Sequence, residues 1–255
     1  IEKITPKSVE LIGPQTSADL LDASGYVFVQ KSQLAGGSPQ IRGFGANRVL
    51  IVVDGVRMNN TIFRSGNLQN VVSVDANSID NVEIMFGPGA VSFGSDAIGG
   101  VMDFTTKQAK FSQDSSRNLY KTNLFSRYSS ANNEVMGHAD FNFGSKKWAF
   151  LTSASYSKYG DLTAGSHGDS AYLRKYYQGG TIEKQEMFIN TNPQKQIGSG
   201  FSKWNVSQKI KYKISDSAEL SYSIIAASTS DAPRYDRLIV DADQNDTLDY
   251  FSWYY

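Results

Sequence analysis

One short acidic segment has the side-chain types and spacing that bind a hard cation. Asp241–Asp246 (DADQND) places carboxylate and amide oxygens at alternate positions, as the start of a calcium-binding loop does. The segment departs from an EF-hand loop, because Asp246 replaces the turn glycine and Ser252 stands where the bidentate glutamate belongs. We therefore expect no EF-hand. The alternative to an ordinary solvated loop is a less regular Ca²⁺ site on Asp241, Asp243 and Asn245.

Histidine and cysteine chemistry is equally restricted. The sequence has no cysteine, which excludes disulfides, zinc–thiolate sites and cysteine nucleophiles. Either of its two histidines, His138 and His167, could ligate a haem iron. A single histidine on a polar strand face, however, more often forms hydrogen bonds. Neither a phosphate-binding loop with Gly-Lys-Ser/Thr nor a nucleophile elbow occurs in the sequence. We therefore expect a protein that is not an enzyme and that requires no cofactor.

The overall composition says little about the architecture. The 255 residues include 25 Lys+Arg and 25 Asp+Glu, and 40% of them are hydrophobic. Zero net charge argues against a nucleic-acid binder that works by bulk electrostatics, and the hydrophobic content is too high for a disordered chain. No apolar run approaches the roughly 18 residues of a membrane helix, and no signal peptide is recognisable at the start.

The residue types change near residue 107. Of the 14 Tyr and 3 Trp, only Tyr26 precedes that point, whereas most of the 22 glycines lie before it. The polar stretch that follows is typical of a linker. We expect a first domain over 1–106, a linker over 107–117 and a different architecture over 118–255.

The first domain is expected to be a small α+β unit. Thr16 or Ser17 can cap a short helix that Gly25 ends. Asp54-Gly55 is a hairpin turn dipeptide, and the run that precedes it is apolar throughout, as in a fully buried strand. The predicted strands are Tyr26–Val29, Val49–Val53, Val56–Met58, Asn81–Phe86 and Gly100–Thr105.

The second region alternates polar and apolar residues with a period of two. Such alternation fits an outer-membrane β-barrel, whose lipid face is apolar and whose lumen is wet, and it fits a soluble antiparallel sandwich equally well. The connections favour the barrel, because short turns alternate with a long loop over 160–200. The predicted strands are Asn118–Ser129, Glu134–Phe143, Trp148–Tyr159, Phe201–Lys213 and Ala218–Thr229.

Two blocks of the first domain carry a family resemblance. The first is IRGFG followed by RVLIVVDGVR, and the second is IDNVEI, GPGA and FGSDAIGGV. In this order and spacing they resemble the plug-domain core of TonB-dependent outer-membrane receptors, with 1–106 as the plug and the remainder as the opening strands of the barrel. One departure is Phe86, which stands where the family usually has arginine before Gly-Pro. That departure puts one plug-to-barrel charge contact in doubt.

The resemblance implies the fold class and the function. The expected fold is an α+β N-terminal plug domain followed by antiparallel transmembrane β-barrel strands. The five or six strands predicted here cannot close a barrel of about 22 strands, so we expect the chain to be part of a longer protein. The implied function is import across the bacterial outer membrane, energised by a TonB-type protein of the inner membrane. A passive porin-like channel and a surface β-barrel with a binding or adhesive role are the alternatives.

The implied partners are a TonB-type protein, outer-membrane lipid, a nutrient ligand and a surface-exposed accessory lipoprotein, with no nucleic acid. The cargo would be haem, an iron–siderophore, a cobalamin or an oligosaccharide. Haem ranks first, because the stretch from Asp231–Asp236 to Trp253–Tyr255 resembles receptors for haem or haemoproteins.

By resemblance, two groups of residues in the first domain have roles. A latch between the plug and the barrel wall is expected at Arg42, Arg48 and Glu83, because charges that face a lumen must be paired or hydrated. The alternative is that these side chains are ordinary solvated strand ends. A ligand-binding apex is expected at Asn59, Asn60, Phe63, Arg64 and Asn67, with a second candidate apex at Lys31 and Gln33.

Overall fold

The structure of the protein is a computed structural model. It describes residues 1–31, 33–45, 48–58, 71–87, 92–114, 117–170, 173–180, 185–233, 235–238 and 240. The chain divides into two compact units, each of which is described by itself. The first contains Ile1–Asn123, Asp140–Ser153 and Val206–Ala226, and the second contains Leu124–Ala139, Ala154–Asn205 and the described residues from Ala227 onward.

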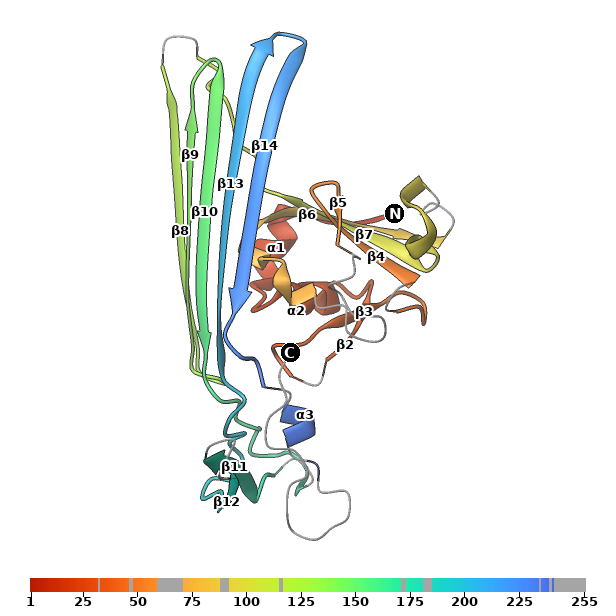
Figure 1. The fold of residues 1–255 in the computed structure, drawn as a ribbon, viewed down its shortest axis with the longest axis vertical. Helices are drawn as coiled ribbons and strands as arrows, with labels where there is room; N and C mark the ends of the chain where they lie inside the picture. The colour runs from red at the N-terminus through yellow and green to blue at the C-terminus, as the bar shows by residue number, and fades with distance from the viewer. Residues whose placement is uncertain are drawn as a thin grey trace. The chain divides into compact units, whose positions relative to one another are not determined.

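A five-stranded mixed sheet forms the centre of the N-terminal region (Figure 1). Its order is β1-β6-β7-β4-β5, in which β4 and β7 are parallel and the other neighbours are antiparallel. The four strands predicted between residues 49 and 105 are confirmed, the predicted Tyr26–Val29 overlaps a strand outside this sheet, and β1 was not predicted. The bounds are β1 Glu2–Ile4, β4 Val49–Val53, β5 Val56–Arg57, β6 Ile79–Phe86 and β7 Gly100–Thr106. A separate antiparallel pair consists of β2 Phe28–Gln30 and β3 Ser38–Gln40.

Strand β4 is buried along its whole length, as its uninterrupted aliphatic sequence predicts. Alternate residues of a strand point to opposite faces, and here both faces are covered. Val49, Ile51 and Val53 belong to the main core. Leu50 and Val52 pack with Val101 and Ala97 in a second cluster.

Two short helices supply the other half of the main core. Helix α2, Ser17–Ala23, begins with a capping box between Thr16 and Asp19, and its Leu20 and Leu21 pack against the sheet. This helix was predicted. Helix α1, Pro6–Ile12, was not; Thr5 caps its start and the left-handed Gly13 ends it. Single 3₁₀ turns occur at η2 Val71–Ser73, η3 Ala76–Ser78 and η5 Ser95–Ala97.

The second sheet has the order β14-β13-β10-β9-β8, with neighbouring strands antiparallel (Figure 1). Each predicted strand is confirmed to within about two residues. The described strands form an open sheet in which β8 and β14 are the edges. The bounds are β8 Leu119–Ser129, β9 Glu134–Gly144, β10 Trp148–Tyr159, β13 Phe201–Ser215 and β14 Ala218–Thr229.

Strands β9 and β13 of this sheet bury mainly polar residues and expose mainly apolar ones. In β9, Asp140 is 3% exposed, whereas its neighbour Phe141 is 44% exposed and Val135 is 59% exposed. In β13, Lys203 is buried and Trp204 is exposed in the same way. A water-soluble sandwich would show the opposite pattern, so the burial pattern favours strands that present an apolar face to lipid.

Aromatic side chains gather at one end of these strands, near the turns that follow β9 and β13. Trp148 lies with its ring centroid 5.8 Å from that of Phe150 and 4.4 Å from that of Tyr212. Phe143 and Tyr120 continue the row. A band of aromatic residues at the strand ends is typical of barrels that span a membrane. None of the helices among the described residues has the length and apolar character to cross a membrane.

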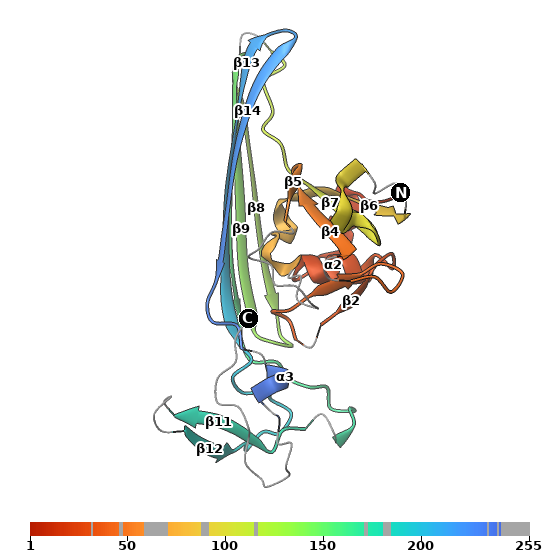
Figure 2. The same ribbon diagram turned by 45° about the vertical axis from the view of Figure 1, so that its right-hand side comes forward.

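The predicted long loop over 160–200 contains a hairpin of its own (Figure 2). Strand β11, Tyr176–Gly180, pairs with β12, Gln185–Ile189, and the rings of Tyr177 and Phe188 stack across the pair. A short helix, α3, spans Tyr235–Leu238.

Candidate functional site

Asp54 lies where the N-terminal sheet meets the second sheet. It forms the β4–β5 hairpin turn with Gly55, at φ values of 49° and 83°, and this left-handed geometry suits a two-residue turn. Strand β7 runs parallel to β4, so the carboxyl ends of both strands lie at the same edge of the sheet. The Asp54 carboxylate therefore accepts hydrogen bonds from the Thr106 backbone N–H at 2.9 Å and from its hydroxyl at 2.6 Å.

Lys209 of β13 completes this arrangement from the second sheet. Its ammonium lies 2.8 Å from the Asp54 carboxylate and donates to the Thr106 carbonyl oxygen at 3.3 Å. The Lys209 side chain is only 5% exposed. A buried charge needs its partner, because removal of one member of such a pair typically costs 3–5 kcal/mol. We call Asp54, Thr106 and Lys209 the latch.

A second set of contacts holds the segment after Thr106 against β9. The Lys107 ammonium lies 2.8 Å from the Asp140 carboxylate. The Asn142 side chain forms two hydrogen bonds with the Lys110 backbone, accepting from its N–H and donating to its carbonyl. Gly144 leaves room for this approach, since a Cβ there would overlap the Lys110 carbonyl oxygen. The start of the predicted linker is therefore tightly bound to a strand.

The three residues that were predicted to join the plug to the barrel wall make other contacts. The Arg42 guanidinium lies 5.0 Å from the centre of the Phe86 ring, so this aromatic residue binds a cation at the position where the family pattern has arginine. The Glu83 carboxylate binds the Lys3 ammonium at 2.9 Å. Arg48 is exposed, and its carbonyl oxygen accepts a hydrogen bond from Gly99. These contacts all lie within residues 1–106, and a role for the three residues at the barrel wall stays a prediction.

The predicted apex residues fall into two groups. Lys31 pairs with Asp19 of α2, and Gln33 is 7% exposed. Ligand contact by these two stays a prediction. The other predicted apex residues and the predicted cation ligands lie outside the described residues; they are Asn59, Asn60, Phe63, Arg64, Asn67, Asp241, Asp243 and Asn245.

Sequence reasoning missed the latch for a physical reason. Asp54 was predicted only as a turn residue, and Lys209 only as part of the alternating strand Phe201–Lys213. Alternation indicates which residues of a strand share a face. It does not indicate which of them meets a carboxylate far away in the sequence.

Asp103 of β7 carries a charge that the fold disfavours. Its pKa is raised above the usual 3.8 by burial, and the nearby carboxylates of Glu83 and Asp54 raise it further. A raised carboxyl pKa means that the folded state binds the proton more tightly than the unfolded state does. The contribution of Asp103 to the stability of the fold is therefore fully present below pH 3.8. This contribution is lost as the pH rises through the pKa of the folded state.

We predict that Asp103→Asn stabilises the N-terminal region at neutral pH. The asparagine removes the disfavoured charge, and we expect the thermal midpoint to rise by about 2 °C at pH 7, a modest gain because the group is partly solvated. The gain should shrink towards zero in acid, where the wild-type carboxyl is already protonated. Thermal scans of the intact protein at both pH values measure this difference. An equal gain at both pH values would show that charge is not the cause.

In the second unit, Asp161 fastens the two ends of the long loop together. One of its carboxylate oxygens accepts hydrogen bonds from the backbone N–H groups of Gly198, Ser199 and Gly200, at 3.0–3.2 Å. Lys195 lies 3.6 Å from the other oxygen. Converging N–H groups of this kind form an anion-binding nest. The loop therefore begins and ends at one fixed point.

We predict that Asp161→Ala loosens the loop and leaves the strands folded. The variant removes an ionised acceptor that serves three backbone donors, so protease cleavage within 160–200 should become about tenfold faster or more. Limited proteolysis of the intact protein measures this rate. Asp169→Ala is the matched control, because Asp169 is an exposed aspartate of the same loop. Similar cleavage rates in the two variants would contradict the prediction.

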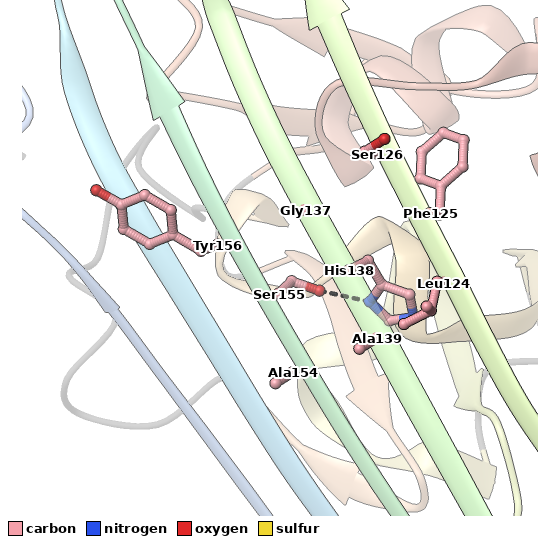
Figure 3. A pocket seen from close by; sticks show the side chains of 9 residues that line it. All are labelled: Leu124, Phe125, Ser126, Gly137, His138, Ala139, Ala154, Ser155 and Tyr156. Carbon is pink, nitrogen blue, oxygen red and sulfur yellow. Dashed lines mark hydrogen bonds between the residues drawn. The ribbon is translucent and has the colours of Figure 1, made fainter.

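A groove of about 480 Å³ crosses β8, β9 and β10 in the second unit (Figure 3). Its lining combines small residues such as Gly137 and Ala154 with the larger Leu124, Phe125 and Tyr156. His138 is buried beside it, with Nδ1 2.7 Å from the Ser155 hydroxyl, as the dashed line in Figure 3 shows. In the part of the chain that the structure describes, no group of three or more His, Cys, Asp or Glu side chains could hold a metal ion.

Comparisons with known proteins agree with this architecture. Residues 1–101 match the family model described as TonB-dependent Receptor Plug Domain. Vitamin B12 transporter BtuB from Vibrio vulnificus (strain CMCP6) is 35% identical over 114 residues, which are 44% of this chain and 18% of that protein. The hemin receptor of Yersinia pestis is 35% identical over 95 residues, which are 37% of this chain and 14% of that protein.

The fold also resembles solved structures. The FrpB iron transporter from Neisseria meningitidis (F3-3 variant) superposes with a TM-score of 0.63 at 18% identity, covering 89% of this chain and 30% of that one. At this identity the likeness shows the fold. The region compared thus spans less than a fifth of the two curated relatives and less than a third of the solved structure.

Proposed function

Because residues 1–101 of this chain are the plug domain of a TonB-dependent receptor, we propose that the intact protein imports a scarce nutrient across the bacterial outer membrane. The chain supplies the plug and five strands with the character of a barrel wall. In this proposal a TonB-type protein of the inner membrane delivers the energy, the ligand binds from outside, and the protein performs no chemical reaction.

The latch is the observation that carries this proposal. A passive channel has no reason to hold a folded domain with a buried ion pair, whereas a gated importer must hold its plug closed and still release it. The pair of Asp54 with Lys209, together with the Thr106 contacts, can hold the plug closed. A charge pair of this kind can also open to hydrated groups when the plug moves, unlike a continuous apolar interface.

We propose haem as the first cargo to test. The hemin receptor and the vitamin B12 transporter are equally identical to this chain over their matched regions. The resemblance of Asp231–Asp236 and Trp253–Tyr255 to haem receptors also supports haem. Iron–siderophores, cobalamins and oligosaccharides are the other candidates.

Uptake by living cells tests the function. A deletion strain should lose growth on one such nutrient as the sole source, and the wild-type strain should lose the same growth when the proton gradient is collapsed. Loss of growth that does not depend on the gradient would favour a passive channel, as would a large open conductance of the purified protein. Unchanged uptake of every nutrient would favour the adhesive alternative.

The predicted apex is tested by ligand binding to the intact protein. Phe63→Ala combined with Arg64→Ala should lower affinity for the imported nutrient without loss of folded protein, since both side chains belong to the proposed contact surface. Unchanged affinity would remove this segment from the site. The Ca²⁺ proposal for Asp241, Asp243 and Asn245 is tested in the same assay, because chelation should weaken binding only if the cation orders an outer loop.

A further inference from the structure

Three charged side chains form one row across neighbouring strands of the plug sheet. Lys3 of β1 lies directly opposite Glu83 of β6, and Glu83 lies directly opposite Asp103 of β7. On the far side of Asp103 the row continues with Val52 of β4, which is apolar, and ends at Arg57 of β5, which is paired with Asp96. The order across the sheet is therefore a cation, two anions, an aliphatic residue and a cation that already has a partner. Like charges placed directly opposite each other on neighbouring strands destabilise a sheet.

Lys3 balances the two carboxylates. Its ammonium lies 2.9 Å from Glu83. Among the described residues, the Asp103 side chain has no ion pair or hydrogen bond, and the carboxylates near it are those of Glu83 and Asp54. The charge of Asp54 is already matched by Lys209 in the latch. Lys3 is therefore the cation on which the Glu83–Asp103 pair depends.

Strand β1 is weakly attached to the sheet. It is an edge strand, and it pairs with β6 over only three residues. Ile4, which is 2% exposed, is its single anchor in the core. The Lys3–Glu83 pair is partly exposed, so it contributes little to holding the strand in place. A pull on the chain before residue 3 would thus act on β1 before it acts on the central strands.

We propose that Lys3 is a removable counter-charge: when β1 leaves the sheet, Glu83 and Asp103 are left facing each other, and the pairing of β6 with β7 loosens. Detachment of one short strand is thereby transmitted to the centre of the plug. The source of the pull rests on the proposed function, since it is the TonB-type protein that would provide it. The charge row itself is a property of the fold and operates however β1 is detached.

Hydrogen exchange of the intact protein in detergent tests the row without any pull. Lys3→Gln leaves β1 in place but removes its charge, so β6 and β7 amides should exchange about two- to five-fold faster than in the wild type, as expected for an opposed like-charge pair. Lys7→Gln is the matched control, because Lys7 is exposed on α1. This variant should exchange as the wild type does.

A double variant separates charge from packing. In Lys3→Gln with Asp103→Asn, no like charges face each other, and exchange of the β6 and β7 amides should return to the wild-type rate or below it. The inference is overturned if Lys3→Gln exchanges at the wild-type rate, or if the double variant exchanges as fast as Lys3→Gln alone.

These measurements use neither cargo nor TonB. A failure of every uptake assay would therefore overturn the proposed function and leave the charge row standing. Normal uptake combined with unchanged exchange in Lys3→Gln would overturn the charge row alone.

Discussion

Asp54→Asn is expected to lower the free energy of unfolding of the plug by about 3 kcal/mol, because it leaves the buried Lys209 ammonium without its counter-charge. Asparagine tolerates the left-handed turn conformation and keeps the shape of the side chain. The loss is therefore electrostatic and does not arise from a strained turn. Thermal or denaturant unfolding of the intact protein, followed by a probe in the plug, measures it.

Two further variants make this prediction sharp. Asp54→Asn combined with Lys209→Met removes both charges and should recover much of the lost stability, because no charge is then left buried and unpaired. Asp22→Asn is the matched control, since Asp22 is exposed at the end of α2, and it should change stability little. A double variant as unstable as Asp54→Asn alone would show that the pair does not hold the plug.

Gly100→Ala is expected to lower the free energy of unfolding of the plug by about 3 kcal/mol or more. Gly100 has a φ of 150°, and an added Cβ would lie 2.6 Å from the Met85 carbonyl oxygen and 2.9 Å from Ile41. Neither neighbour can move freely, because Met85 belongs to the β6–β7 ladder and Ile41 is buried. We expect little folded protein in the membrane fraction.

Gly13→Ala is the matched control for this variant. Gly13 also has a positive φ, 54°, but an added Cβ there would meet nothing within 4 Å. Its cost should be only that of the left-handed conformation, about 1 kcal/mol. Equal losses in the two variants would mean that backbone conformation, and not the close approach of β6 and β7, makes glycine necessary at residue 100.

The elements that could be predicted from sequence are those whose burial pattern is local. Val49–Val53 is apolar at every position because both of its faces are covered, and the long strands alternate because one face is apolar and the other is polar. The helix capped by Thr16 was predictable from its capping residues. Strand β1 and helix α1 were not, because three residues of mixed character carry no period and most of α1 is exposed.

The contacts of the site were less predictable than the elements. Arg42 and Glu83 were predicted by resemblance to contact the barrel wall, and that role stays a prediction; their partners in the structure, Phe86 and Lys3, could not be predicted from the sequence. The Lys3–Glu83 pair is set by the register of β1 against β6. Register across strands is a tertiary property, which the residue pattern within one strand does not determine. The Asp54–Lys209 pair was hidden for the same reason.

The binding of Lys107 to Asp140 bears on how far the plug can travel. Thr106, which shares the Asp54 carboxylate with Lys209, is followed in the chain by Lys107, which is fixed to β9. Breaking the Asp54–Lys209 pair therefore does not free the end of β7, because the next residue, Lys107, stays joined to β9. Any displacement of the plug would then be smallest near residue 106.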